Sequence, residues 1–259
     1  MYGNSKVCVI IPALNEAPSI GRVIEGLFQV TVCPEGHPVN QPDRNCHGPL
    51  ARLVDDIVVG DNGSTDGTAE IARQAGAHVV AEPEPGYGSA CLAALSAPVE
   101  RDIVVFVDGD HSVVADELPL LLDPIMAGAD IVIGSRTLGD CHKGALSIPQ
   151  RVGNKVASEL IRLLWNTKVT DLGPFRAVTN EALNSIDMQD RHFGWTVEMQ
   201  VRAIQLSLNM AEVPVTTQAR IGKSKIGGTV KGVIGASRGI LGMIFKLYFN
   251  ERRSKALQT

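Results

Sequence analysis

Short runs of β-branched and other apolar residues recur along the first half of the chain, and each is followed by a polar loop and a helical pattern. The runs cover residues 7–11, 57–59, 78–81, 103–107 and 131–133. Strands that are apolar throughout are typical of a sheet covered on both faces, and alternation with helices favours parallel pairing. The sequence therefore predicts an α/β fold with a mostly parallel central sheet flanked by helices.

Helical patterns separate these runs. Apolar side chains recur at helical spacing after Ser19 and again after Thr68, two residue types that favour helix N-termini. Further helices are expected over residues 151–165 and 196–208, with a strand around 175–178. In sheets of this kind, functional loops gather at the carboxyl ends of the strands, near the point where strand order reverses. We therefore expect the chemistry at that edge.

Length and composition favour one main domain. The chain has 259 residues, of which 44% are hydrophobic and 20% charged, as in an ordinary globular protein. Residues 31–53 are rich in proline and glycine and are predicted to be a loop insertion. Residues 1–228 are expected to form the main domain. Residues 229–259 are expected to form an amphipathic helical tail that packs on the core or lies in a membrane interface.

Charge and targeting signals narrow the partners and the compartment. A net charge of −4 gives no general attraction to nucleic acid, although Lys and Arg become denser after Arg136. The five cysteines are odd in number, and Cys8 and Cys91 lie in apolar segments, which favours a reducing compartment. No signal sequence or long apolar run is found. A cytoplasmic protein, with possible peripheral contact at the cytoplasmic membrane face, is expected.

Two acids bracket a glycine directly after the apolar run 103–107, as Asp108, Gly109 and Asp110. Carboxylate oxygens at a strand end suit a hard divalent cation, and Mg²⁺ or Mn²⁺ commonly keeps waters while bridging substrate phosphates. Asp108 and Asp110 are therefore candidate metal ligands in a diphosphate site. Taken alone, the motif is equally compatible with a solvated Asp-Gly turn.

Four other motifs stand in order around this acid pair. Residues 11–16 read Ile-Pro-Ala-Leu-Asn-Glu, 61–68 read Asp-Asn-Gly-Ser-Thr-Asp-Gly-Thr, 84–88 read Glu-Pro-Gly-Tyr-Gly, and 133–136 read Ile-Gly-Ser-Arg. In this order the motifs resemble those of the family-2 glycosyltransferases. The resemblance implies the GT-A fold, a Rossmann-like fold of nucleotide-diphospho-sugar transferases, and makes residues 1–228 the catalytic domain.

Two later motifs refine the resemblance. Residues 170–177 (Thr-Asp-Leu-Gly-Pro-Phe-Arg-Ala) and 220–225 (Arg-Ile-Gly-Lys-Ser-Lys) look like motifs of the polyprenyl-phosphate branch, which includes the dolichyl-phosphate mannose and glucose synthases. The likeness extends over roughly residues 6 to 240. The proline-rich insertion and the lack of transmembrane helices depart from some members of that branch, so both features leave the acceptor open.

The resemblance also implies which residues bind the donor. Pro12, Asn15 and Glu16 would lie beside the nucleoside, and Asp61 would accept a hydrogen bond from a ring N–H of the base. Uracil and guanine offer such a donor, whereas a carboxylate only accepts, which disfavours adenine and cytosine. Gly88 would belong to the glycine loop at the donor. The implied donor is a UDP- or GDP-sugar.

The implied reaction is an inverting transfer of a hexose, with a nucleoside diphosphate as the leaving group. A cation held by Asp110, with Asp108 reaching it directly or through the ribose or a water, would neutralise the diphosphate. A hydroxyl acceptor would need a general base such as Asp171 or Glu198. A polyprenyl phosphate is already anionic and needs only orientation and charge compensation.

The basic second half of the chain is easier to explain with a phosphate acceptor. Guanidinium groups suit phosphate oxygens because they donate two parallel hydrogen bonds. The candidate phosphate-binding residues, some for the donor and some for the acceptor, are Arg136, Arg151, Arg176, Arg220 and Lys225. Asp110, Asp171, Arg136 and Arg176 are the candidate catalytic residues, and Arg220 and Lys225 are candidate donor-binding residues.

Three other functions remain as alternatives. A glycosyltransferase acting on a soluble hydroxyl acceptor would use the same donor site. A sugar-phosphate nucleotidyltransferase would usually have a glycine-rich loop after the first strand, where this chain has residues 12–16 instead. A non-catalytic nucleotide-sugar-binding module is also possible, since fold does not fix function. A Rossmann dehydrogenase is excluded because no Gly-x-Gly-x-x-Gly follows the first strand.

Overall fold

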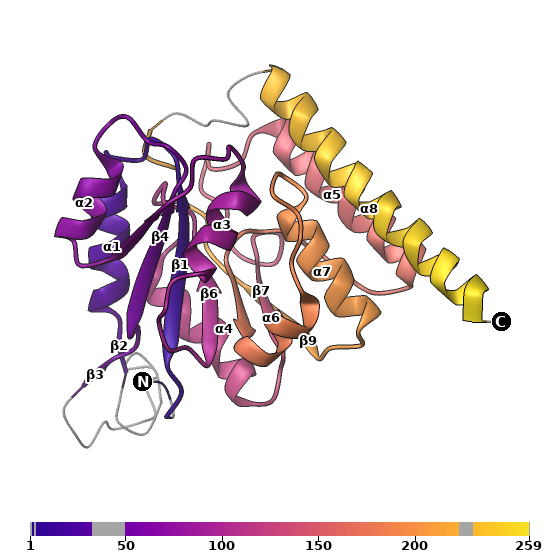
Figure 1. The fold of residues 1–259 in the computed structure, drawn as a ribbon, viewed down its shortest axis with the longest axis horizontal. Coiled ribbons are helices and arrows are strands. Elements are labelled where there is room, and N and C mark those ends of the chain that lie inside the picture. Colours follow the sequence, from indigo (N-terminus) through magenta and orange to yellow (C-terminus); the bar gives the residue numbers. More distant parts are fainter. Residues whose placement is uncertain (1, 3, 33–49, 223–229, 259) are drawn as a thin grey trace.

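Strands from both halves of the chain form one sheet in the computed structural model, which describes residues 2, 4–32, 50–222 and 230–258. Figure 1 shows this sheet at the centre of the molecule with helices around it. Within the described residues its order is β5 (His78–Ala81), β4 (Asp56–Asp61), β1 (Val7–Ala13), β6 (Ile103–Phe106), β8 (Arg176–Thr179), β7 (Ile131–Ser135) and β9 (Met210–Pro214). β8 is antiparallel to both of its neighbours, and the other pairings are parallel.

The predicted α/β fold with a mostly parallel sheet is confirmed. The five apolar runs of the first half correspond to β1, β4, β5, β6 and β7, and the strand expected around 175–178 is β8. Alternate residues of β1 enter two different cores, since Val9 and Ile11 face one side of the sheet while Cys8 and Ile10 face the other. Continuous burial is the reason why β1, β4, β6 and β7 read as uninterrupted apolar runs.

Helices cover the sheet on both sides. α1 (Ile20–Gln29), α2 (Thr68–Gln74) and α4 (Leu118–Met126) bury apolar residues in one core, and α3 (Tyr87–Leu95), α6 (Asn180–Ile186) and α7 (Trp195–Gln205) do so in the other. A single 3-10 turn at Ala115–Glu117 leads into α4. The helices α1, α2 and α7 lie where the sequence predicted them, within a few residues.

Two long helices form a further layer outside α7. α5 (Ile148–Trp165) begins three residues earlier than predicted, because Ser147 caps it through a capping box with Gln150. α8 (Val230–Gln258) lies beside α5 (Figure 1), and Met243 and Ile244 of α8 share a small apolar core with α5 and α7. The tail predicted over residues 229–259 thus contains a helix that packs on the core with one face.

The predicted insertion at residues 31–53 begins and ends in paired backbone. β2 (Thr31–Val32) and β3 (Ala51–Arg52) form a short antiparallel pair. Residues 33–49 lie outside the described part of the chain. Among the helices that the structure describes, none is both long enough and apolar enough to span a bilayer.

Gly60 of β4 allows α3 to lie directly against the sheet. A Cβ atom at this position would come within 2.0 Å of the Ala90 carbonyl oxygen of α3. We expect Gly60→Ala to destabilise the protein by about 1–3 kcal/mol and to lower Tm by about 2–12 °C in a circular-dichroism melt. Gly153→Ala is the matched control, because a Cβ there meets no atom within 4 Å. A Gly60→Ala protein with wild-type Tm would contradict this prediction.

Candidate active site

Two cavities meet at the carboxyl ends of β1 and β6. The chain leaves β1 for β4 on one side and later returns to β6 on the other, which makes this edge the switch point of the sheet. The first cavity, of about 420 Å³, is lined by residues that include Pro12, Glu16, Asn62, Tyr87 and Phe193. The second cavity, of about 370 Å³, is lined by residues that include Arg136, Ser147, Gln150 and Thr217. Asp108, Asp110 and Arg220 line both cavities.

Arg220 joins two carboxylates where the cavities meet. Its Nη2 lies 3.1 Å from Glu16 Oε1, and its Nη1 lies 3.2 Å from Asp110 Oδ2. Both acids are buried. The backbone N–H of Ile221 donates to the Asp110 carbonyl oxygen at 2.9 Å, which fixes this segment against the acid pair. The structure thus brings together three predicted site residues that are far apart in the sequence.

Asp108 adds another carboxylate to the junction of the two cavities. Burial, together with the neighbouring carboxylate of Asp110, raises the pKa of Asp108 to about 7. The Tyr87 hydroxyl donates a hydrogen bond to Asp108 Oδ1 at 3.1 Å. In the described ranges, no group of three or more His, Cys, Asp or Glu side chains is arranged to hold a metal ion. Any cation here would therefore take its remaining ligands from a substrate or from water.

The loops after β1 and β4 are tied to each other by side chains of their motifs. Asn15 has a φ of +52° and accepts a hydrogen bond from the Thr65 backbone N–H at 2.8 Å, while its own N–H donates to Ser64 Oγ at 2.9 Å. Asp66 accepts from the Ala17 N–H at 3.1 Å. Asn15 therefore holds two loops together, and it is not one of the residues lining the first cavity.

Asp61 ends β4 beside the first cavity and is buried. The Ser64 N–H approaches its Oδ1 at 3.3 Å. The next residue, Asn62, lines the cavity and accepts a hydrogen bond from the Gly86 N–H at 2.8 Å. Sequence reasoning missed Asn62, although it belongs to the same motif as Asp61.

Gly88 allows the start of α3 to lie close to the backbone of Asp190. A Cβ atom there would come within 2.0 Å of the Asp190 carbonyl oxygen, and the Gly88 N–H donates to the His192 carbonyl oxygen at 3.3 Å. The structure therefore places Gly88 against the loop of residues 190–192, while Tyr87 and Gly86 beside it line the first cavity. The predicted contact between Gly88 and a nucleotide stays a prediction.

Arg136 reaches the second cavity from the end of β7 and is held by Asp171. The Asp171 carboxylate accepts hydrogen bonds from the Arg136 backbone N–H at 2.7 Å, from Nε at 2.8 Å and from Nη2 at 2.7 Å. Burial opposes the charge on Arg136, but the hydrogen bonds to Asp171 raise the pKa of Arg136 overall. Asp171 is fully buried and lines neither cavity.

Arg176 was a candidate for contact with phosphate, but the structure brings it to neither cavity. Its side chain is 1% exposed, and it donates from Nε to the Gly173 carbonyl oxygen at 3.1 Å and from Nη1 to the Thr196 carbonyl oxygen at 2.9 Å. Burial lowers the pKa of Arg176 to about 10. These contacts fasten the loop before β8 to the start of α7.

Three candidates remain, namely Glu198, Arg151 and Lys225. Glu198 is buried and accepts from the backbone N–H groups of Gln189 at 3.0 Å and Asp190 at 2.7 Å. Arg151 is exposed near the N-terminus of α5. Lys225 lies outside the described residues.

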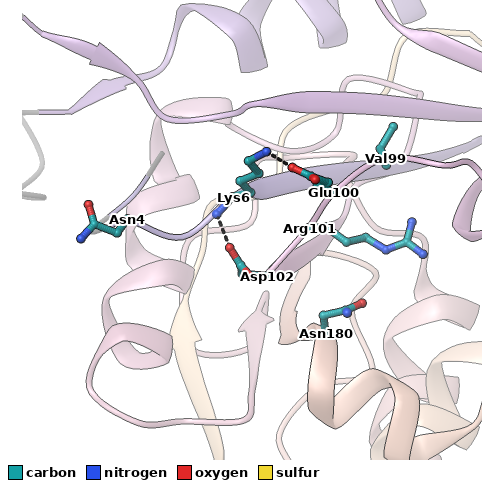
Figure 2. Close-up of a pocket in the computed structure, with 7 residues that line it drawn as sticks. All are labelled: Asn4, Lys6, Val99, Glu100, Arg101, Asp102 and Asn180. Carbon is teal, nitrogen blue, oxygen red and sulfur yellow. Dashed lines mark hydrogen bonds and ion pairs between the residues drawn. The ribbon is translucent and has the colours of Figure 1, made fainter.

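A larger cavity, of about 510 Å³, lies at the opposite end of the sheet and is drawn in Figure 2. The ammonium group of Lys6 contacts Glu100 there, and its backbone N–H donates to Asp102 Oδ2 at 2.8 Å. Arg101 points away from this cluster (Figure 2) and donates to the Leu95 carbonyl oxygen at 2.6 Å. Lys6 is paired with Glu100 and Asp102, and the strand-end motifs lie at the other end of the sheet, so the chemistry is better placed at the two cavities described above.

Comparisons with known proteins identify the family of this chain. The model of the family "Glycosyl transferase family 2" matches residues 8–186. A dolichyl-phosphate hexose transferase of Haloferax volcanii is 37% identical over 228 residues, which are 87% of this chain and 88% of that protein. A polyprenol monophosphomannose synthase of Mycolicibacterium smegmatis is 28% identical over 241 residues, covering 86% of this chain and 82% of that one. These relatives confirm the predicted resemblance to the polyprenyl-phosphate branch.

Solved structures confirm the predicted fold. A glucosyl-3-phosphoglycerate synthase from Mycobacterium tuberculosis, in complex with Mn²⁺, UDP and glucosyl-3-phosphoglycerate, superposes with a TM-score of 0.71 at 23% identity over 95% of this chain and 80% of that one. The same enzyme with Mg²⁺ and UDP gives a TM-score of 0.68 at 22% identity, with coverage of 95% and 80%. The chain therefore belongs to glycosyl transferase family 2 and is a glycosyltransferase of the GT-A fold.

Proposed function

We propose that this glycosyltransferase moves a hexose from a UDP- or GDP-sugar to a polyprenyl phosphate, with inversion at the anomeric carbon and with help from Mg²⁺ or Mn²⁺. The observation that carries this proposal is the meeting of two cavities at Asp108 and Asp110, with a guanidinium group in the second cavity. The relatives named for dolichyl and polyprenol phosphates support the acceptor, and the solved structures with UDP support the donor.

The residues at the junction fit a divalent cation. The donors are carboxylate oxygens, which hard cations prefer, and a cation would offset both the burial and the neighbouring Asp110 carboxylate that raise the pKa of Asp108. Arg220 already places positive charge 3.2 Å from Asp110. Asp108 and Asp110 would hold the ion, and when bound it would act as a Lewis acid on the departing diphosphate.

The two cavities would divide the substrates between them. Pro12, Glu16 and Asp61 would contact the nucleoside in and beside the first cavity, and Arg220 would neutralise the diphosphate at the junction. In the second cavity, Arg136 would donate two parallel hydrogen bonds to the acceptor phosphate. Ser147 at the N-terminus of α5 adds the positive end of a helix dipole to the same cavity.

The fate of the two candidate bases favours a phosphate acceptor over a hydroxyl acceptor. Asp171 is engaged by three hydrogen bonds from Arg136, and Glu198 by two backbone N–H groups. Neither side chain lines either of the two cavities described above. An anionic phosphate needs no proton removed, so this arrangement suits it.

The outer helices supply a surface that suits a membrane. Ile148, Val152, Val156 and Leu163 recur on the exposed side of α5, and Ile148 is 78% exposed. Phe245 and Phe249 are exposed on α8 and stack at 6.4 Å between ring centroids. Basic residues outnumber acids in the two helices. The acids are Glu159 in α5 and Glu251 in α8, and the basic residues are Arg151, Lys155 and Arg162 in α5 and Lys231, Arg238, Lys246, Arg252, Arg253 and Lys255 in α8.

Helices that combine basic residues with exposed apolar residues are typical of proteins that rest on anionic lipid. We therefore extend the proposal to peripheral contact at the cytoplasmic membrane face, made by α5 and α8. In this arrangement residues 1–228 supply the chemistry, and the tail of residues 229–259 supplies part of the membrane contact.

A donor screen tests the proposed function. Purified protein is incubated with Mg²⁺ or Mn²⁺ and a panel of UDP- and GDP-sugars, and the released nucleoside diphosphate is measured with and without polyprenyl phosphate. We expect release that requires both the metal and the lipid phosphate. Release driven by a soluble hydroxyl compound in place of the lipid would overturn the acceptor assignment. Release without a metal would overturn the proposed metal dependence.

Vesicle binding tests the membrane face. We expect the double variant Val152→Asp/Val156→Asp to lower binding to anionic vesicles by at least about tenfold, because each buried valine side chain contributes about 1.5 kcal/mol or more. Leu120→Asp is the matched control, since Leu120 is an exposed leucine of α4 on the other side of the sheet. Co-sedimentation of the three proteins measures the difference. Equal binding by the double variant and the control would contradict the assignment.

A further inference from the structure

Tyr87 is the first residue of α3, and its side chain lies between the glycine loop and the acid pair. The ring lines the first cavity, and the hydroxyl donates to Asp108 Oδ1 at 3.1 Å. No other side chain in the described part of the chain donates a hydrogen bond to the Asp108 carboxylate. Tyr87 therefore contacts a predicted metal ligand while standing outside the set of residues predicted for the site.

The backbone of Tyr87 is fixed on both sides. A Cβ at Gly86 would come within 2.0 Å of the Arg191 carbonyl oxygen, and a Cβ at Gly88 would come equally close to that of Asp190. The Ser89 N–H donates to the Arg191 carbonyl oxygen at 2.9 Å. Two contacts that leave no room for a side chain thus clamp the start of α3 onto the loop of residues 190–192. The direction in which the Tyr87 side chain leaves the backbone is set by this clamp.

A fixed donor restricts the rotation of the carboxylate that it contacts. Without a partner, the Asp108 carboxylate could turn about its Cβ–Cγ bond, and each orientation would present different lone pairs to the junction. The Tyr87 hydroxyl engages Oδ1, which leaves Oδ2 and the remaining lone pair of Oδ1 for a cation, a ribose hydroxyl or a water. Groups that orient the ligands of a metal ion commonly change its affinity by ten- to a hundredfold when removed.

We propose that Tyr87 is a positioning residue that orients Asp108 for the divalent cation and the nucleoside diphosphate, an inference that rests on the proposed function. Tyr87 acts through Asp108 and has no role in moving a proton. The clamp of Gly86 and Gly88 on residues 190–192 is the structural support of this role.

Binding of Mn²⁺ to the full-length protein in the presence of UDP provides the test, read from the electron paramagnetic resonance signal of free Mn²⁺. We expect Tyr87→Phe to raise the Kd for Mn²⁺ about ten- to a hundredfold. Tyr248→Phe, on α8, is the matched control and should bind like the wild type. In an Asp108→Ala background, Tyr87→Phe should have no further effect, because no side-chain oxygen then remains for the hydroxyl to orient.

The contrary outcomes separate two failures. A Tyr87→Phe protein whose Kd stays within about twofold of wild type would overturn this inference and leave the proposed function intact. A wild-type protein that binds no Mn²⁺ with UDP would overturn the proposed metal dependence, and this inference with it. Tyr87→Phe keeps the ring, so its Tm should stay within a few degrees of wild type, and a large fall would assign the hydroxyl to the fold instead.

Discussion

Replacing Asp110 by asparagine is expected to lower kcat/KM about a thousandfold, which corresponds to about 4 kcal/mol of lost transition-state stabilisation. The carboxylate would be a ligand of the cation that neutralises the departing diphosphate, and an amide lacks the charge to hold that cation. Folding should survive, because the asparagine oxygen can still accept from the Ser112 N–H, 3.0 Å from Asp110 Oδ1, and Arg220 keeps its ion pair with Glu16. Turnover and stability should therefore separate in this variant.

Initial rates of nucleoside diphosphate release and thermal melts, measured on the same preparations, would check this separation. Asp116→Asn is a suitable control, since Asp116 is an exposed acid in the 3-10 turn that follows the same loop. The control should keep wild-type rate and Tm. If Asp110→Asn kept more than about a tenth of the wild-type rate, the acid pair would not be the centre of the chemistry.

Asp171→Asn is expected to destabilise the protein by about 3–5 kcal/mol and to lower Tm by roughly 10 °C. The loss follows from the ion pair, because the Arg136 side chain is only 20% exposed and its guanidinium group would keep its charge beside a neutral amide. Activity should fall as well, because Arg136 would no longer be held at the second cavity. We expect KM for the acceptor to rise by a larger factor than kcat falls.

This result would distinguish the general base that the sequence offered in Asp171 from the ion-pair partner of Arg136 that the structure shows. Removal of a general base would lower kcat with little change in Tm, and the limb of the pH–rate profile due to that base would disappear. Removal of an ion-pair partner would instead lower Tm. Asp140→Asn, at an exposed acid of the loop after β7, controls for the loss of one charge near the cavity. A stable but inactive Asp171→Asn protein would favour the hydroxyl-acceptor alternative.

The fold could be predicted from the sequence where local pattern and burial agree. The apolar runs of β1, β4 and β6 are buried on both faces, so every residue in them is apolar and the signal is strong. β9 (Met210–Pro214) was missed because its residues are only partly buried or exposed, and a short edge strand of that kind shows no clear pattern. The antiparallel direction of β8 was not predicted, since it depends on how the connections before and after it pass the sheet.

The sequence predicted individual residues of the site better than the contacts between them. The strand-end motifs correctly located Glu16, Asp108 and Asp110 at one edge. Sequence reasoning did not pair Arg220 with Glu16 or Arg136 with Asp171, because contacts across 204 and 35 residues leave no periodic signal. It also grouped Arg176 with the phosphate-binding residues, since an arginine that serves buried carbonyl groups looks the same in a motif.

The arrangement of α5 has a consequence for the kinetics. Its apolar side chains extend for about 22 Å from Ile148 to Leu163, and the helix begins at the rim of the second cavity. With this face against a bilayer, the cavity would open at the level of the lipid headgroups. The enzyme would then search for its acceptor in two dimensions. Its rate should follow the mole fraction of lipid phosphate in the vesicle and stay constant when more vesicles of the same composition are added.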